Sequence, residues 1–561
     1  MMKKLSIGVS DFEEIISQKY YFVDKSGLIK EIVDSGAKVT LIPRPRRFGK
    51  TLNMTMLQCF FEKTEKSKRN LFDGLKISKE SNIMTHQGQY PIIYLTFKDV
   101  KQNNWDDCYD KVRKVISSEF SRHKYLYESD ALSEFEKKSF YSVLEGSASR
   151  ATLENSLKDL STYLHKHHNK KPIILIDEYD MPIIAGFTYD YYEEIISFMR
   201  GYLCGGLKDN RDLSFAVMTG ILRVAKESIF SGLNNLEVCS ITNDTYADKF
   251  GFLESEVREL VDYFGCSGEM DDVRKWYNGY SSGENHTVYN PWSIINFVKN
   301  RGRFGAYWVN TSDNKIIQEL IRKSSEDVKR DFELIFAKKP VNKTICEDIV
   351  FSEIYRDSNA LWSFLVFSGY LTWQSLKFVQ AKCRVALVVP NDEVLYCLKT
   401  LVERWFSESM GSSIYENMLE ALSQGNISAF ERYFQQNIVD SMSYFDVTKK
   451  NPERVYHAYV LGMLVGLSAT HEVKSNRESG FGRYDVCLIP NDITKPGIVI
   501  EFKAFNERED KDINIAAKRA LVQIEEKQYE AELLSRGIKK IIKLAIVFEG
   551  KKVLIISKTN F

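Results

Sequence analysis

The sequence predicts an α/β protein in which two α/β units flank a mostly helical region. Residues 1–245 alternate short apolar runs with longer amphipathic stretches, which is the pattern of strands and helices around a mainly parallel sheet. Residues 246–410 are mostly helical in pattern, with a hairpin predicted at "FVQAKCRVALVV". From residue 411 long helical stretches lead back into strand patterns, so a second α/β unit is predicted at 411–561.

Composition limits the class of protein. The chain has 561 residues and is 44% hydrophobic, enough for a large core and several domains. Its 77 Lys and Arg residues nearly balance 76 Asp and Glu residues, so binding to nucleic acid would need a local patch. The nine cysteines form no C-x-x-C pair, which favours a reducing compartment over a disulfide framework or a zinc site. We therefore expect a cytoplasmic protein, with no signal peptide and no membrane partner.

The first predicted strand ends at a stretch with phosphate-binding chemistry. Four apolar runs predict the strands of the first unit, at residues 38–42, 91–97, 172–176 and 213–219. After the first comes "PRPRRFGKTLNMTML", in which Gly49, Lys50 and Thr51 open a helix. Free backbone N–H groups, a lysine and a hydroxyl suit nucleotide phosphates and Mg²⁺. Arg44 occupies the first-glycine position of the P-loop pattern, so a chance Gly-Lys-Thr remains the alternative.

The third predicted strand delivers two adjacent carboxylates, Asp177 and Glu178, at its end. In a Walker B site Asp177 would hold Mg²⁺ and Glu178 would polarise the attacking water. The additional strand at 91–97 suggests the class of P-loop ATPases whose catalytic glutamate lies beside that aspartate. Thr219 and Arg223, after the fourth strand, are candidate γ-phosphate sensors, with a strand cap and a surface arginine as alternatives. Asp180 either shapes this site or caps a helix.

These segments together resemble a known family. "RPRRFGKTL", "ILIDEYDMPI", "MTGILRVAKESIFSGLNNL", "WYNGY" and "VYNPWSI" are similar to a bacterial AAA-like ATPase family that carries a C-terminal nuclease-like domain. The resemblance implies an AAA-like ASCE P-loop domain, a helical or winged-helix-like lid, and a restriction-endonuclease-like domain of the PD-(D/E)xK superfamily. Arg44 looks typical of that family. The residues then expected to bind ATP and its Mg²⁺ are Arg44, Arg47, Phe48, Gly49, Lys50, Thr51, Asp177, Thr219 and Arg223. The aromatic residues 276–280 are expected to be packing residues of the lid.

The strand "GIVIEFKAF" carries the second constellation. Glu501 and Lys503 point to one face of this strand, and Asp485 lies sixteen positions before Glu501 on a neighbouring predicted strand. The pattern D-x15-E-x-K resembles the PD-(D/E)xK signature, with Tyr484 in place of the proline. Asp485 and Glu501 would hold Mg²⁺ or Mn²⁺, while Lys503 positions the nucleophile or stabilises negative charge. An ion-pair cluster in an inactive nuclease fold is the alternative.

Flanking helices add candidates to this site. Glu453 lies on the helix before the strands, where the superfamily often places another acid, and His457 follows one turn later. Gln523 and Tyr529 follow the strand in a predicted helix, where the resemblance implies a polar residue that faces the site. For His457 an ordinary helical histidine is the favoured interpretation, and contact with the site is the alternative.

Two functions follow from these motifs. The favoured one is an ATP-regulated, Mg²⁺-dependent nuclease that acts on nucleic acid, DNA rather than RNA. The alternative is a regulatory ATPase switch whose nuclease-like domain only binds nucleic acid or protein. Arg477 and Arg483 are possible phosphate contacts or parts of a solvated hairpin. The resemblance also suggests a homo-oligomer, because AAA-type relatives often form rings in which a neighbouring subunit supplies an arginine finger; Arg223 and Arg258 are weak candidates for that finger.

Overall fold

The structure is a computed structural model that divides into two compact units. The first contains Met1–Ser312 and Asn342–Val394, and the second contains Asp313–Val341 and Leu395–Phe561. The domain boundaries at 245 and 410 stay predictions. The structure describes residues 3–560 except 225–233, 267–269, 309–316, 318–325, 337, 350, 352–353, 355–356, 381, 411, 442–459, 461–462, 465, 468–469, 480–481, 506–509, 511 and 550–551.

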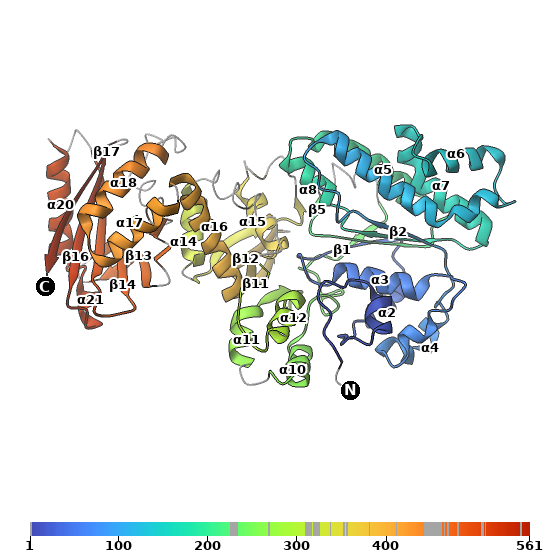
Figure 1. The fold of residues 1–561 in the computed structure, drawn as a ribbon, viewed down its shortest axis with the longest axis horizontal. Helices are drawn as coiled ribbons and strands as arrows, with labels where there is room; N and C mark the ends of the chain where they lie inside the picture. The colour runs from blue at the N-terminus through green and yellow to red at the C-terminus, as the bar shows by residue number, and fades with distance from the viewer. Residues whose placement is uncertain are drawn as a thin grey trace. The chain divides into compact units, whose positions relative to one another are not determined.

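A parallel sheet forms the centre of the first unit, with the strand order β2-β3-β4-β1-β6 (Figure 1). Every residue of β1, β3 and β4 is buried, as expected for uninterrupted apolar strands covered on both faces. The four predicted strands are confirmed with small shifts at their ends. The strands are β1 (Val39–Pro43), β2 (Ile92–Thr96), β3 (Ile173–Asp177), β4 (Ala216–Gly220) and β6 (Leu236–Val238).

Helices cover both faces of this sheet (Figure 1). Several begin with side-chain caps: Asn104 and Ser149 accept hydrogen bonds from the backbone N–H groups of Asp107 and Thr152, which satisfies helix-end donors. The helices are α1 (Phe12–Ser17), α2 (Gly27–Ser35), α3 (Lys50–Phe61), α4 (Ser81–Met84), α5 (Trp105–Arg122), α6 (Glu134–Leu144), α7 (Arg150–His168), α8 (Met181–Thr188) and α9 (Tyr192–Leu207), with 3-10 turns η1 (Arg69–Phe72), η2 (Lys76–Lys79) and η3 (Lys124–Glu128).

The next part of the chain mixes helices with short strands. Its helices are α10 (Glu254–Tyr263), α11 (Met270–Tyr277), α12 (Pro291–Lys299) and α15 (Ser358–Phe367). Its strands are β5 (Arg223–Val224), β7 (Tyr280–Ser282), β8 (His286–Val288), β9 (Val341–Ile345), β10 (Asp348–Ile349), β11 (Thr372–Val379) and β12 (Lys382–Val388). The predicted hairpin is confirmed as β11 and β12. The β7–β8 and β5–β10 pairs are too short to show an alternating pattern in the sequence.

The second unit is built on a mixed sheet with the order β13-β14-β15-β16-β17. Strands β15 and β16 run parallel, whereas the other neighbours are antiparallel. The strands are β13 (His471–Ser479), β14 (Gly482–Pro490), β15 (Gly497–Ala504), β16 (Ile541–Glu549) and β17 (Lys552–Asn560). The helices of this part are α14 (Glu326–Phe336), α16 (Asp392–Met410), α17 (Ser412–Gln424), α18 (Ile427–Ser441), α20 (Ile513–Glu526) and α21 (Ala531–Ser535). Strand β13 is the one element of this sheet that the sequence pattern does not predict.

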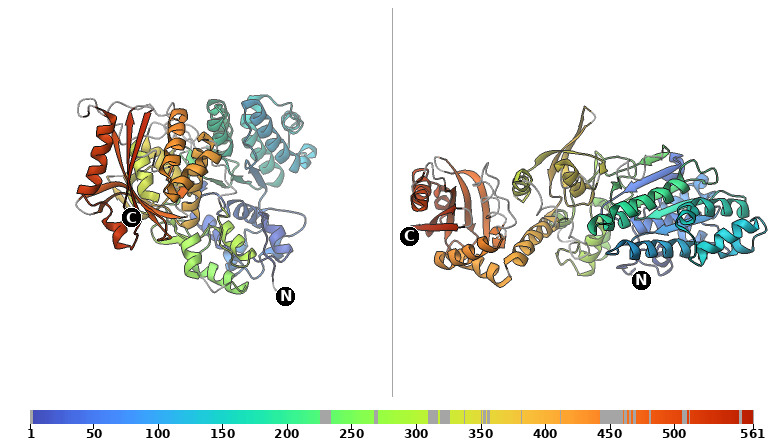
Figure 2. Two further views of the ribbon diagram at one scale, coloured as in Figure 1. Left: turned by 60° about the vertical axis from the view of Figure 1, so that its left-hand side comes forward. Right: turned by 90° about the horizontal axis from the view of Figure 1, so that it is seen from above.

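The two faces of β15 have different surroundings (Figure 2). Ile498, Ile500 and Phe502 belong to the apolar core shared with α17 and α18. Val499 belongs to the cluster on the other face, together with Ile524 of α20. Because successive side chains of a strand alternate, the odd-numbered residues of β15, including its acid and its amine, share the α20 face.

Gly279 provides a direct test of the packing in the first unit. Its φ is 99°, and a Cβ there would overlap the carbonyl oxygen of Pro390. We expect Gly279→Ala to cost about 2–4 kcal/mol of unfolding free energy, because strain and overlap add. Gly265 also has a positive φ, 73°, but no atom lies within 4 Å of its Cβ position, so Gly265→Ala should cost about 1 kcal/mol. Urea unfolding followed by circular dichroism measures both, and equal destabilisation by the two substitutions would contradict the packing described.

Candidate functional sites

The loop between β1 and α3 turns sharply at Gly49. Gly49 has a φ of 82° and is the N-cap residue of α3, whose first residue is Lys50. Glycine adopts this left-handed conformation without strain, whereas other residues rarely do. The turn places the first N–H groups of α3 at the carboxyl end of the sheet, and a helix N-terminus there favours a bound anion.

The ammonium group of Lys50 lies inside this loop. Its Nζ donates hydrogen bonds of 3.1 Å to the carbonyl oxygens of Arg44 and Pro45, and it lies 3.9 Å from Oε1 of Glu178. Burial lowers the pKa of Lys50, and Glu178 is the first of the nearby carboxylates that oppose this shift. Two of the three ammonium N–H groups therefore bind backbone carbonyls, and a carboxylate lies close by.

Asp177 is the buried centre of the site. Thr51 Oγ1, from α3, donates a 2.8 Å hydrogen bond to its Oδ2, and Thr219 Oγ1, from the end of β4, donates a 2.7 Å bond to its Oδ1. Thr96, at the end of β2, donates at 3.3 Å to Oδ2. Burial, and next the charge of Glu178, raise the pKa of Asp177, while the hydroxyl donors lower it. Three strand or helix ends thus meet at one carboxylate.

Sequence reasoning does not single out Thr96. Thr96 is the register partner of Asp177 in the β2–β3 pairing, so a hydroxyl residue at the end of the strand beside β3 is the signal that could find it. Glu178 follows with a φ of 52° and a side chain that is 21% exposed. This turn separates the two acids: Asp177 points into the hydroxyl cluster, and Glu178 extends toward Lys50.

Arg44 occupies a different place from the other loop residues. Its guanidinium is buried and donates to the carbonyl oxygens of Cys239, at 2.7 Å, and Tyr246, at 3.3 Å, while it lies over the ring of Phe250. Burial lowers its pKa to about 10. The side chain therefore ties the loop to the segment after β6, and it is the carbonyl oxygen of Arg44 that contacts Lys50.

Residues 280–292, from β7 to the start of α12, contact the same loop. The guanidinium of Arg47 lies over the ring of Trp292, 4.5 Å from its centroid, and Phe48 packs edge-on against Tyr280. The Nδ2 group of Asn290 donates to the carbonyl oxygen of Arg46 at 3.5 Å. The segments around "YNGY" and "VYNPW" thus pack on the loop. The sequence predicts packing for residues 276–280 only.

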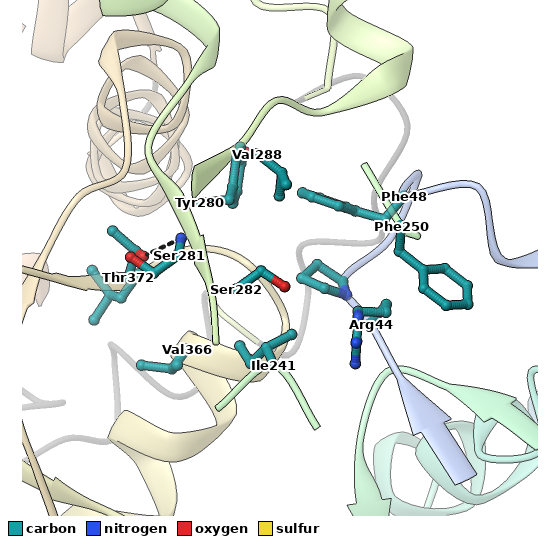
Figure 3. Close-up of a pocket in the computed structure, with 12 residues that line it drawn as sticks. Arg44, Phe48, Ile241, Phe250, Tyr280, Ser281, Ser282, Val288, Val366 and Thr372 are labelled. Atoms are coloured by element: carbon teal, nitrogen blue, oxygen red, sulfur yellow. Dashed lines mark hydrogen bonds between the residues drawn. The ribbon is translucent and has the colours of Figure 1, made fainter. Parts of the chain in front are cut away.

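A small pocket lies between the loop and this segment (Figure 3). Phe48, Tyr280 and Val288 line one part of it, and Ser281 is held to Thr372 by a 3.0 Å hydrogen bond from its backbone N–H to Oγ1. The lining is mostly apolar, so Arg44, Pro45 and Phe48 of the loop face a largely hydrophobic surface of the first unit.

Arg223 and Arg258, the two arginines predicted to act at the nucleotide site, form ion pairs with residues outside that site. Arg223 pairs with Asp348 at 2.8 Å, between β5 and β10. Arg258 pairs with Glu254 at 3.3 Å on α10, and its side chain is 54% exposed. Among the described residues, neither arginine joins the hydrogen bonds around Asp177.

Asp180 links the ends of β3 and β4. It occupies the N-cap position of α8 but makes no side-chain cap bond there. Instead its Oδ2 accepts hydrogen bonds from the backbone N–H groups of Ile221, at 2.7 Å, and Leu222, at 2.8 Å. Burial raises its pKa to about 6. Of the two interpretations of Asp180, the geometry supports the one in which it shapes the site.

The second site lies in the second unit, on β14 and β15. Asp485, one residue beyond the paired Val486 and Ile500, accepts a 2.8 Å hydrogen bond at Oδ2 from the backbone N–H of Phe502. This contact fixes the Asp485 carboxylate beside the strand segment that carries Glu501. Glu501 itself is buried, with 2% of its surface exposed.

Donors from two elements converge on Glu501. Lys503 Nζ lies 3.1 Å from Oε1 of Glu501, and Gln523 Nε2, from α20, donates to the same oxygen. Gln523 also contacts the hydroxyl of Tyr529 at 3.3 Å. Burial, and then the nearby carboxylates of Glu501 and Asp485, raise the pKa of Tyr529. The structure therefore brings together Asp485, Glu501, Lys503 and Gln523, and adds Tyr529 at their edge.

Other residues predicted for this site are not placed. Glu453 and His457 lie outside the described residues. Arg477 and Arg483 belong to β13 and β14, but their side chains are outside the described part of the structure.

The oxygen donors at both sites fit a hard divalent cation. Asp485 and Glu501 supply carboxylate oxygens in the second unit, and Thr51 and Asp177 supply a hydroxyl and a carboxylate in the first. Mg²⁺ and Mn²⁺ prefer such ligands. Within the described residues no group of three or more His, Cys, Asp or Glu side chains is arranged to hold a metal, so water, backbone or substrate oxygens would complete the coordination.

The fold and these two sites define a class of protein: a parallel α/β unit with a Gly-Lys-Thr loop, joined in one chain to a mixed α/β unit with an Asp, Glu and Lys cluster. Residues 6–230 match the model of the AAA-ATPase-like family, described as predicted AAA-ATPase, and residues 451–558 match that of the PD-(D/E)XK nuclease superfamily. The chain thus carries an AAA-ATPase-like domain followed by a PD-(D/E)XK superfamily domain, which confirms the architecture that its motifs resemble.

One curated relative extends over nearly the whole chain. It is described as an uncharacterized protein in the vnfD 5′ region of Azotobacter chroococcum mcd 1. The two are 25% identical over 547 residues, which cover 95% of this chain and 94% of the relative. The similarity therefore extends across both domains. In the described part of the chain, every helix is too short or too polar to span a bilayer.

The pKa of Asp180 gives a test of the first site. A carboxyl whose folded pKa, about 6, exceeds its unfolded value of 3.8 binds its proton more tightly in the folded state, so it removes stability as pH rises through this range. Asp180→Asn should therefore gain up to about 3 kcal/mol relative to wild type between pH 4 and pH 7, at about 1.4 kcal/mol per pKa unit. Urea unfolding at both pH values measures the difference. If the difference in unfolding free energy between Asp180→Asn and wild type is the same at pH 4 and pH 7, the raised pKa of Asp180 is contradicted. Asp34→Asn, at an exposed position, is the control.

Proposed function

We propose that this protein binds and hydrolyses ATP in its first unit and cleaves nucleic acid, DNA in the first instance, in its second unit. In this proposal the nucleotide state regulates the nuclease. The observation that carries it is the convergence of Asp485, Glu501, Lys503 and Gln523 in one domain, in a chain whose other domain gathers Lys50, Thr51 and Asp177. Both family matches, to AAA-ATPase-like and PD-(D/E)XK domains, support it.

The residues of the first site have defined roles in this proposal. The N–H groups at the start of α3 and the Lys50 ammonium bind the β- and γ-phosphates of ATP. Thr51 and Asp177 would hold Mg²⁺, which supplies charge neutralisation at the phosphates when bound. Glu178, displaced from Asp177 by its left-handed turn, orients the attacking water as general base. Thr219 and Thr96 hold the Asp177 carboxylate in place through their hydroxyl groups.

Arg47 and Phe48 offer a route from nucleotide to the rest of the first unit. Both directly precede Gly49 of the phosphate-binding turn and contact residues 280–292, through Trp292 and Tyr280. A phosphate that attracts the Arg47 guanidinium competes with its cation–π contact to Trp292, a contact of about 0.5–2 kcal/mol. ATP would thereby alter the packing of this segment. We propose this segment as the element that responds to the nucleotide.

In the proposed cleavage of a phosphodiester, each side chain of the second site has one role. Asp485 and Glu501 would hold a divalent cation, Mg²⁺ or Mn²⁺, which when bound acts as a Lewis acid and lowers the pKa of water. Lys503 stabilises the negative charge that develops on the phosphate or positions the attacking water. Gln523 orients the Glu501 carboxylate. Tyr529, in contact with Gln523, limits its movement.

The alternative function also includes nucleotide binding by the first unit, but without nucleic-acid cleavage by the second. In it the protein is an ATP-dependent switch whose nuclease-like domain only binds nucleic acid or protein. The net charge of +1 favours this function, because no general electrostatic field draws nucleic acid to the active site. Cleavage assays on wild type and Lys503→Ala separate the two. The free thiols of all nine cysteines are consistent with a reducing compartment for either function.

Lys50→Ala tests the nucleotide site. Loss of the ammonium should weaken ATP binding at least tenfold, about 1.4 kcal/mol, because it removes charge-assisted hydrogen bonds to the phosphates. Isothermal titration of ATP with Mg²⁺ measures the affinity. Lys66→Ala, which removes an exposed lysine just after α3, should bind like wild type. Equal affinity of Lys50→Ala and wild type would contradict the proposed site.

Lys503→Ala tests the nuclease site. We expect cleavage of linear duplex DNA with Mg²⁺ or Mn²⁺ to fall at least about 100-fold, because charge stabilisation at the reacting phosphate is removed. Lys527→Ala, an exposed lysine of the same unit, should cut at the wild-type rate. Circular and single-stranded DNA and RNA are assayed in parallel. Cleavage retained by Lys503→Ala would assign the activity elsewhere, and no cleavage of any substrate by wild type would favour the switch.

A further inference from the structure

Strands β11 and β12 form a long antiparallel ribbon, residues 372–388, called the ribbon below. It stands out from the rest of its unit in the right-hand view of Figure 2. Gln380, in its turn, has a φ of 50°, as tight hairpin turns require. The side chains beyond Trp373 on β11 are exposed or half-buried, so the ribbon presents much of its length to solvent.

The register of the ribbon separates two faces. Residues directly opposite each other in an antiparallel pair share a face. Cys383, Val385 and Leu387 lie on the face turned toward the unit and are 7%, 3% and 0% exposed. Lys377 lies opposite Arg384 on the other face, which is exposed.

The exposed face carries only positive charge. Lys382, opposite Val379, adds a third cation beside Lys377 and Arg384. The ribbon sequence "TWQSLKFVQAKCRVALV" contains no Asp or Glu. Among the described residues none of the three cations forms an ion pair. Like charges directly opposite each other destabilise a strand pair, so the arrangement costs stability and indicates an external anion.

The tip adds an aromatic side chain. Phe378 lies opposite Cys383, on the other face from Lys377, but it is 63% exposed, and its neighbour Val379 is 39% exposed. Cations beside an exposed aromatic residue suit a nucleic acid. The cations can contact its phosphates, and the aromatic ring can make an apolar contact with its bases. On its other edge β12 pairs with β9, so the ribbon belongs to a three-stranded sheet of order β11-β12-β9. The major groove of a DNA duplex admits a two-stranded ribbon, so the part of this sheet that suits the groove is the end of the β11–β12 hairpin that carries Phe378.

We propose that the ribbon is a binding element for duplex DNA, with Lys377, Lys382 and Arg384 on the phosphates and Phe378 at the groove. The partner class rests on the proposed function, whereas the site itself lies outside both the nucleotide site and the nuclease site. It supplies the local patch that a chain of net charge +1 needs in order to hold DNA. Phosphate contacts of this kind position a duplex without reading its sequence.

Binding is measured by fluorescence anisotropy with a labelled duplex of about 30 base pairs, in EDTA so that no cleavage occurs. We expect Lys377→Ala/Arg384→Ala to bind at least tenfold more weakly. The slope of log affinity against log salt should become shallower by about 2, because each phosphate that the protein neutralises contributes about 0.9 to that slope. Phe378→Ser should weaken binding without changing the slope. Lys114→Ala/Lys138→Ala, which removes two exposed lysines from α5 and α6, should match wild type.

The outcomes separate this inference from the proposed function. Lys377→Ala/Arg384→Ala should unfold at or above the wild-type temperature, because a like-charge pair is removed. Wild-type affinity and salt slope in this variant would overturn the inference, even if Lys503 proves essential for cleavage. Loss of DNA binding in the variant would support it, even if wild type cuts nothing. Loss of binding to phosphatidylserine vesicles with unchanged DNA binding would also overturn it.

Discussion

A carboxylate taken out of water must be held by nearby donors, and both candidate sites depend on this requirement. Asp177 is buried at the end of β3, and its two oxygens accept hydrogen bonds from Thr51 and Thr219. Glu501 is buried on β15 and is held by Lys503 and Gln523. An unpaired buried charge costs several kcal/mol, so each acid fixes the elements that carry its donors. The geometry of the sites follows from this compensation.

The two sheets supply those donors in different ways. In the parallel sheet of the first unit, the carboxyl ends of β2, β3 and β4 lie at one edge, so Thr96, Asp177 and Thr219 meet there. In the mixed sheet of the second unit, side chains alternate between two faces, and Glu501 and Lys503 share the face covered by α20. Parallel order and strand alternation thus place acid, cation and amide within hydrogen-bond distance.

The sequence predicts a site residue correctly where a single local pattern determines both where the residue lies and which residue it contacts. Strand alternation predicts the Glu501 and Lys503 pair, and a strand end followed by two acids predicts the Asp177 environment. A local sequence pattern does not predict a contact whose two residues come from segments that are distant in the sequence. The Arg44 guanidinium turns to carbonyl oxygens after β6, and Arg223 pairs with Asp348, contacts that depend on tertiary packing. Thr96 is missed because a hydroxyl at a strand end is common.

The central claim is that Asp485 and Glu501 hold a divalent cation in a nuclease site. The most direct measurement is Mn²⁺ binding to the nucleotide-free protein, by titration calorimetry or electron paramagnetic resonance, for wild type and Glu501→Gln. We expect a Mn²⁺ site in wild type that is absent in Glu501→Gln, while ATP binding by Lys50 and Asp177 is unchanged. Identical Mn²⁺ binding in both proteins, or none in wild type, would contradict it.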